Sequence, residues 1–91
     1  MDELLDTCEE VNRVGADFLK VDLKTALIFV KIARETADDF QKRRNRWAAR
    51  TAYETVVNLF TKINLTTEDC LVVKHGLDRL KSELETLGET F

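Results

Sequence analysis

The chain has 91 residues, of which 44% are hydrophobic and 34% are charged, and its formal net charge is −3. This balance excludes a disordered chain, and the absence of proline with only three glycines argues against sandwiches and barrels, which need many turns. A chain of this length forms one domain, residues 1–91, that buries roughly 60–65% of its unfolded surface. We therefore expect a single all-α domain.

The first predicted element is a short helix over residues 2–14, with Asp2 as its N-cap. Its apolar face consists of Leu4, Leu5, Cys8 and Val11. Gly15 either ends this helix or is a tolerated interior glycine. The apolar phase slips by one residue at this point, which favours a kink or break at residues 15–17. The sequence thus predicts a separate, shorter N-terminal helix.

The second predicted element is a helix over residues 17–37, although Asp22 could instead be its N-cap. Spacings of four and three, typical of one helix face, relate Leu19, Leu23, Ala26, Val30, Ala33, Ala37 and Phe40. Four further apolar residues fall off this seam and need cover from another surface: Leu27, Ile28, Phe29 and Ile32. We predict that these four take part in self-association. The apolar run is far shorter than the roughly 20 residues of a membrane span, so no membrane contact is expected.

Two more helices are predicted after a turn at Asp38 and Asp39. The helix over residues 41–63 carries a stripe made of Ala49, Tyr53, Val56, Phe60 and Ile63. The helix over residues 67–87 begins with the capping sequence Thr66-Thr67-Glu68-Asp69 and ends at Gly88. We therefore predict an antiparallel bundle of three long helices plus the shorter N-terminal one.

The positive charge is concentrated in one short stretch. Residues 42–50 hold five bases and no acid, whereas ten acids and five bases precede them and seven acids and four bases follow them. The candidate interaction surface in this stretch consists of Lys42, Arg43, Arg46, Trp47 and Arg50. Arginine beside an aromatic ring can grip phosphates, stack on bases or bind an acidic protein surface. The plainer interpretation is a solvated face neutralised by nearby acids, with Trp47 at the edge of the core, and nucleic acid is disfavoured for an acidic chain.

The sequence contains no catalytic signature, and we expect neither an enzyme nor a cofactor. His75 is the only histidine, and a histidine phosphotransfer domain would require lysine and glycine where Asp78 and Arg79 stand. Cys70 and His75 are five residues apart on different sides of a helix, with no second pair to complete a metal site. Two widely separated cysteines favour free thiols, and the opening Met-Asp-Glu is unlike a signal peptide, so a bacterial-type cytoplasmic protein is expected.

Two resemblances add to this interpretation. The spacing Ala49-x-x-x-Tyr53-x-x-Val56 is similar to the second helix of a tetratricopeptide repeat, which implies a TPR-like helical hairpin with its turn at residues 44–46. Phe18-Leu19-x-x-Asp22-Leu23-x-x-Ala26 and the segment from Arg44 to Val56 resemble short helical bacterial proteins of unknown function. That second resemblance implies structural roles at a helix crossing for Asn45, Arg50 and Tyr53.

We therefore expect a non-enzymatic helical module that binds a protein partner or a second copy of itself. The alternative is a small regulatory binder of an anionic ligand or nucleic acid through residues 42–50. Steep salt dependence would distinguish phosphate contacts from apolar association.

Overall fold

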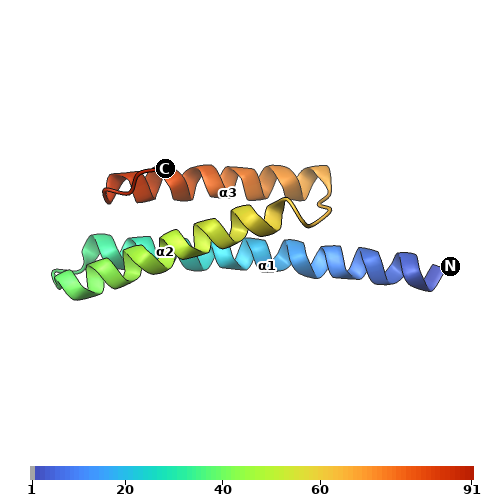
Figure 1. Cartoon of the computed structure of the whole chain (residues 1–91), viewed down its shortest axis with the longest axis horizontal. Coiled ribbons are helices and arrows are strands. Elements are labelled where there is room, and N and C mark those ends of the chain that lie inside the picture. The colour runs from blue at the N-terminus through green and yellow to red at the C-terminus, as the bar shows by residue number, and fades with distance from the viewer. Residues whose placement is uncertain (1) are drawn as a thin grey trace.

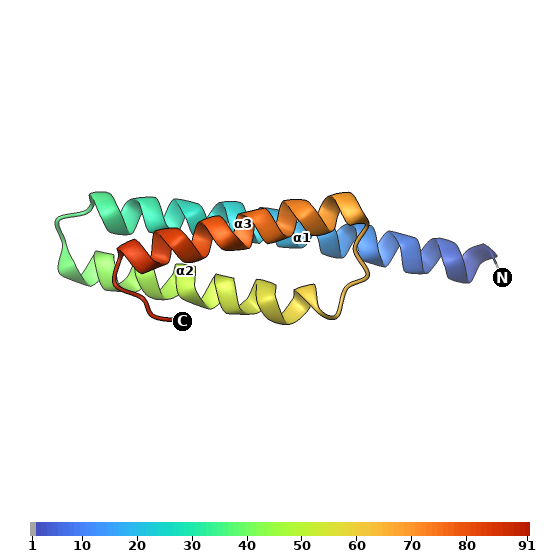
Figure 2. The same ribbon diagram turned by 90° about the horizontal axis from the view of Figure 1, so that it is seen from above.

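The computed structural model describes the backbone of residues 2–91 and the side chains of residues 13–91. Three helices run up, down and up: α1 spans Asp2–Glu35, α2 spans Asp39–Phe60 and α3 spans Thr67–Thr86. They form an elongated bundle measuring 56 × 18 × 16 Å, in which α2 and α3 both lie along α1 (Figures 1 and 2). The predicted all-α antiparallel bundle is confirmed, and it has three helices within the described chain.

The expected break at residues 15–17 is wrong, because α1 is one continuous helix of 34 residues. Gly15 does not have a positive φ. The turn after α2 comes close to this glycine: a Cβ added there would lie 2.8 Å from Cδ1, the end of the Ile63 side chain. The predicted short helix over residues 2–14 is therefore the beginning of α1, and the side chains of its residues 2–12 lie outside those described.

The predicted caps agree with the structure, whereas α2 ends at Phe60, three residues before the predicted end of that helix at residue 63. The Asp38 carboxylate accepts hydrogen bonds from the backbone N–H groups of Phe40 and Gln41, so it caps α2. Thr66 caps α3 by accepting from the N–H of Asp69. Gly88 has a φ of 98°, and the N–H groups of residues 88 and 89 donate to carbonyls of the last turn of α3, which ends that helix as a Schellman motif.

One seam from each helix fills the core. The buried residues of α1 follow the predicted seam and are Ala16, Leu19, Leu23, Ala26, Val30 and Ala33. They pack against Ala49, Ala52 and Val56 of α2 and against Val73, Leu77, Leu80 and Leu84 of α3. The expected continuation of the seam through Ala37 and Phe40 is wrong, because α1 ends at Glu35 and both residues are exposed.

Two further sequence expectations concern the whole chain. No helix within the described residues is long and apolar enough to cross a membrane. The α2 helix continues through residues 44–46, where the tetratricopeptide register would have a turn. The family resemblance itself and the cytoplasmic location stay predictions.

Candidate functional site

The face of α1 that points away from the bundle carries a row of exposed apolar side chains. Between 41% and 61% of the surface of each is exposed, and the row consists of Val14, Phe18, Val21, Ile28 and Ile32. Steps of four, three, seven and four relate them, and Thr25 divides the step of seven into four and three. At about 100° per residue, this row lies nearly opposite the buried seam of the same helix. We call these six residues the outer seam.

Thr25 is the polar member of the outer seam, and its hydroxyl is already satisfied. It donates to the backbone carbonyl of Val21 over 2.9 Å, as threonine commonly does within a helix. A partner that covers the outer seam therefore need not supply an acceptor for this hydroxyl. The seam can be covered by an apolar surface without leaving that donor unpaired.

The structure divides the four residues predicted for self-association. Leu27 and Phe29 are half-buried and pack against the core of their own chain. Ile28 and Ile32 are 57% and 41% exposed and belong to the outer seam. Leu27 and Phe29 are thus covered within the chain, whereas Ile28 and Ile32 are left exposed by the side chains that the structure describes.

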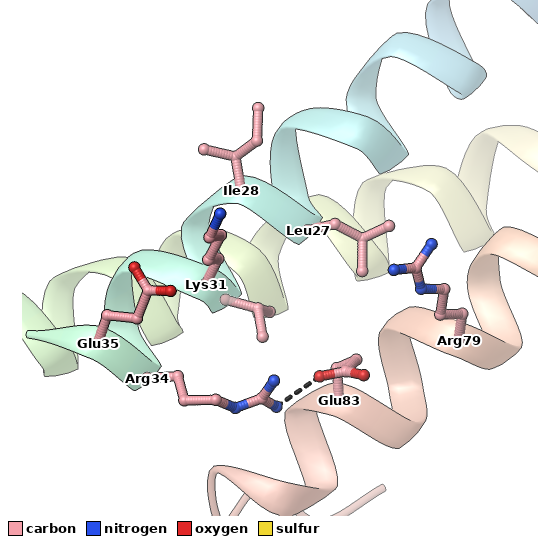
Figure 3. Close-up of a pocket in the computed structure, with 8 residues that line it drawn as sticks. Leu27, Ile28, Lys31, Arg34, Glu35, Arg79 and Glu83 are labelled. Carbon is pink, nitrogen blue, oxygen red and sulfur yellow. Dashed lines mark hydrogen bonds and ion pairs between the residues drawn. The ribbon is translucent and has the colours of Figure 1, made fainter.

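A shallow groove of about 440 Å³ separates α1 from α3 beside the outer seam. Arg34 on α1 forms an ion pair with Glu83 on α3 across the groove. In Figure 3, Leu27 points toward Arg79 on α3, whereas Ile28 points away from α3. The groove therefore forms one border of the outer seam, and the Arg34–Glu83 ion pair crosses it.

Two members of the basic surface are held by the end of the chain. Arg46 forms an ion pair with Glu89 at 2.6 Å. Arg50 donates to the carbonyl of Thr90 at 2.9 Å and lies 3.9 Å from the centroid of the Phe91 ring. The plainer interpretation is thus correct for these two arginines, although the neutralising acids are Glu89 for Arg46 and Glu54 for Arg50, neither of which the sequence analysis indicated.

The remaining basic residues of α2 are exposed. Lys42, Arg43 and Arg44 form no ion pair with another described side chain, and Trp47 is 70% exposed. The expected place of Trp47 at the core edge is therefore wrong. A shallow depression of about 310 Å³ is lined by Arg43, Arg46, Trp47, Arg50 and Glu89.

The residues assigned to a helix crossing lie on two faces of α2. Asn45 is the buried polar residue of the described core, and its amide donates to the carbonyl of Gln41 at 2.8 Å. Tyr53 packs against the core and meets Phe91 edge to face, with ring centroids 4.9 Å apart. Asn45 and Tyr53 thus contribute to packing, while Arg50 holds the chain end.

The pKa values of two carboxylates, Asp69 and Asp22, are shifted from their ordinary value. Asp69 accepts a hydrogen bond of 2.5 Å from the Lys20 ammonium, which lowers the pKa of Asp69 and raises that of Lys20. Burial raises the pKa of Asp22, a half-buried residue on α1. The Lys20–Asp69 pair joins α1 to the start of α3, whereas Asp22 lies on α1 beside Val21 of the outer seam.

His75 and Cys70 do not form a site with each other. His75 is exposed on α3, at the edge of a shallow groove that also borders Lys24. Cys70 is a half-buried free thiol, and Cys8 lies outside the described side chains. Among residues 13–91, no three histidine, cysteine, aspartate or glutamate side chains are grouped closely enough to hold a metal ion.

Comparison of the chain with protein-family models, with curated proteins and with solved structures found no match. The outer seam therefore has to be interpreted from its own chemistry. Three of its members, Val14, Phe18 and Val21, were absent from the surface that the sequence predicted. The signal that finds them is the spacing of four and three, which runs through Phe18 and Val21 as regularly as it runs through the buried seam.

Proposed function

We propose that this protein is a non-enzymatic interaction module that binds a helix of a protein partner along the outer seam of α1. One observation carries the proposal: a straight row of exposed apolar side chains, Val14 to Ile32, on the side of α1 that its own bundle leaves uncovered. Single exposed apolar residues are ordinary, but a contiguous row marks an interaction surface. The stripe has the width and spacing that another helix fills.

Site-specific photo-crosslinking in cells tests this proposal. A photoreactive amino acid is introduced into the full chain at Val21, on the outer seam, and separately at Trp47 and at His75, which are exposed elsewhere. We expect a discrete protein adduct from position 21 and none from position 75. Absence of any adduct from position 21, with protein adducts from position 47, would contradict the proposal and direct attention to the basic surface.

A second candidate function is the binding of an anionic ligand at the exposed part of the basic surface. Arg43 and Trp47 supply a cation and an aromatic face to one depression. However, the Glu89 carboxylate lines the same depression and already pairs with Arg46. An anion would have to displace Glu89 or bind beside it, so this candidate ranks below the outer seam.

The single tryptophan of the chain makes the second candidate measurable. Binding of inorganic phosphate or a short single-stranded oligonucleotide at this depression should change the fluorescence of Trp47. Phosphate contacts would weaken the binding steeply between about 50 and 200 mM salt. Unchanged fluorescence, or a change that Arg43→Gln leaves unaltered, would eliminate this function.

A further inference from the structure

The outer seam has the period of a coiled coil. Position a of a heptad falls on Phe18, Thr25 and Ile32, and position d falls on Val14, Val21 and Ile28. In the sequence, the same spacing continues toward the N-terminus through Val11, Thr7 and Leu4, whose side chains lie outside those described. A seam with a period of 3.5 residues fits knobs-into-holes packing against a second helix, not a flat surface.

The charges beside this seam change sign at its middle. The g positions, on the flank of α1 that borders α3, are Glu3, Glu10, Asp17, Lys24 and Lys31. Asp17, Lys24 and Lys31 are exposed and form no ion pair with another described side chain. The first half of the flank is thus acidic and the second half is basic. Such a flank is complementary in charge to the same flank of a second copy that runs in the opposite direction.

Two antiparallel copies of α1 bring opposite charges together along this flank. Antiparallel pairing places each g position opposite a g position of the second copy. When Phe18 packs against Val21 of the second copy, Asp17 faces Lys24 and, by the same register, Glu10 faces Lys31. Each of these contacts occurs twice in the symmetric pair, and none joins like charges.

Parallel pairing has the opposite electrostatic result. In a parallel pair the g position of one helix faces the e position of the next heptad on the other, which brings Asp17 beside Asp22 twice. Like charges at this spacing are destabilising, and burial already raises the pKa of Asp22 within the single chain. The charge layout therefore favours the antiparallel arrangement.

We infer that the partner of the outer seam is a second copy of this chain, packed antiparallel along α1 with Phe18 against Val21 and Asp17 against Lys24. The inference rests on the proposed function, because it names the helix that the outer seam binds. It also gives the N-terminal turns of α1 a neighbour. These turns extend past the α2–α3 connection (Figure 1), and the pairing aligns them with the C-terminal half of the second α1.

Reversal of one charge at a time in the purified full chain tests this register. Asp17→Lys and Lys24→Asp each turn two attractive contacts of the dimer into two repulsive ones. We expect each variant alone to dimerise about tenfold more weakly than the unsubstituted chain. An equimolar mixture of the two variants should regain the original affinity, because one chain is then cationic at both positions and the other is anionic.

Sedimentation equilibrium at low salt measures these dissociation constants, and circular dichroism verifies that each variant is folded. Lys74→Glu reverses an exposed charge on α3 and should leave the dimer unchanged. A dimer that Asp17→Lys strengthens would overturn the antiparallel register in favour of the parallel one, because the substitution removes the contact with Asp22. A dimer unaffected by either reversal would also overturn the inference.

A chain that stays monomeric at every concentration would overturn the inference without contradicting the proposed function. In that case, an adduct from position 21 in the crosslinking experiment would have the mass of this chain plus a different protein. Dimerisation predicts an adduct of twice the chain mass instead. Failure of the dimer inference and failure of the proposed function are therefore distinguishable.

Discussion

Lys20 and Asp69 connect α1 to α3, which also meet in the core and through the Arg34–Glu83 ion pair. Their ion pair spans 2.5 Å from the middle of α1 to the first turn of α3. Thr66 fixes the same turn by capping α3 through the Asp69 N–H. The aspartate thus combines three interactions that favour its charged form: the ammonium, the Thr66 hydroxyl and the positive end of the helix dipole.

The lowered pKa of Asp69 makes stability depend on pH. The carboxylate stabilises the fold above its ordinary pKa of 3.8, and this contribution is lost as the pH falls through the lower pKa of the folded state. The raised pKa of Lys20 has the opposite sign: its contribution is complete below the ordinary value of 10.5 and is lost at higher pH. We expect Asp69→Asn to lower the melting temperature at neutral pH and to differ progressively less from the unsubstituted chain as the pH falls below 3.8.

Glu68→Gln is the matched control for this prediction. Glu68 occupies the same first turn and has the same dipole interaction, but it forms no hydrogen bond with Lys20. Thermal unfolding followed by circular dichroism should show a smaller loss at neutral pH for Glu68→Gln than for Asp69→Asn. Equal losses would mean that the hydrogen bond from Lys20 adds nothing to the dipole and Coulombic interactions that Glu68 also has.

At the scale of the elements, α1 continues through Gly15, a residue type that commonly ends helices. Gly15 costs the helix about 1 kcal/mol relative to alanine, yet alanine there would bring its Cβ to 2.8 Å from Ile63. The Cδ1 atom of Ile63 can turn away about χ2, whereas its Cγ2 atom, 3.3 Å from the added Cβ, is held by the stiff χ1 of a β-branched residue. The contact between α1 and the turn after α2 therefore opposes helix propensity at this position.

We expect Gly15→Ala to be destabilising, with a net loss of up to about 2 kcal/mol once the gain in propensity is subtracted from the cost of overpacking. Ile63→Val removes the methyl group nearest to the added Cβ, so Gly15→Ala should cost less in that background. Denaturant unfolding of the four chains of this double-mutant cycle measures the coupling. Stabilisation by Gly15→Ala in both backgrounds would contradict the close contact.

Much of the fold could be predicted from the sequence, because caps and periodicity are local. Asp38, Thr66 and Gly88 were correctly assigned to helix ends, since each acts on backbone groups within a few residues. The break at Gly15 was wrong because the close neighbour of that glycine, Ile63, is 48 residues away along the chain. The neutralisation of Arg46 by Glu89 was missed for the same reason.

The candidate site was only partly predictable. Ile28 and Ile32 could be identified as residues that fall off the buried seam. Val14, Phe18 and Val21 were missed because the regular spacing of a second seam was interpreted as a slip of the first. The structure separates the two seams, since only a folded bundle shows which side of α1 the other helices cover.

At the scale of the whole molecule, α1 carries two long seams on nearly opposite sides, so it can belong both to its own bundle and to the dimer that we infer. The buried seam packs against α2 and α3, and the outer seam is the only long apolar row that the described chain leaves uncovered on α1. Because the two seams lie nearly opposite each other, a second α1 can pack on the outside without disturbing α2 or α3. The bundle and the dimer thus use separate surfaces of the same helix.

This arrangement predicts the shape of the dimer. The register that pairs Phe18 with Val21 is centred near the middle of α1, so the two copies overlap over nearly their whole length. The longest dimension of the dimer should therefore remain about that of one chain, whose Cα atoms extend over 56 Å, while the mass doubles. Dimers formed end to end would be almost twice as long.

Small-angle X-ray scattering with in-line size exclusion measures the maximum dimension and the mass together. We expect the Ile28→Glu variant, which places a charge in the outer seam, to have half the mass and nearly the same maximum dimension as the dimer. Ile28 is 57% exposed, so this substitution leaves the core of the single chain intact. A dimer clearly longer than one chain would show that the two copies meet near their ends, and α1 would then need a different occupant for its outer seam.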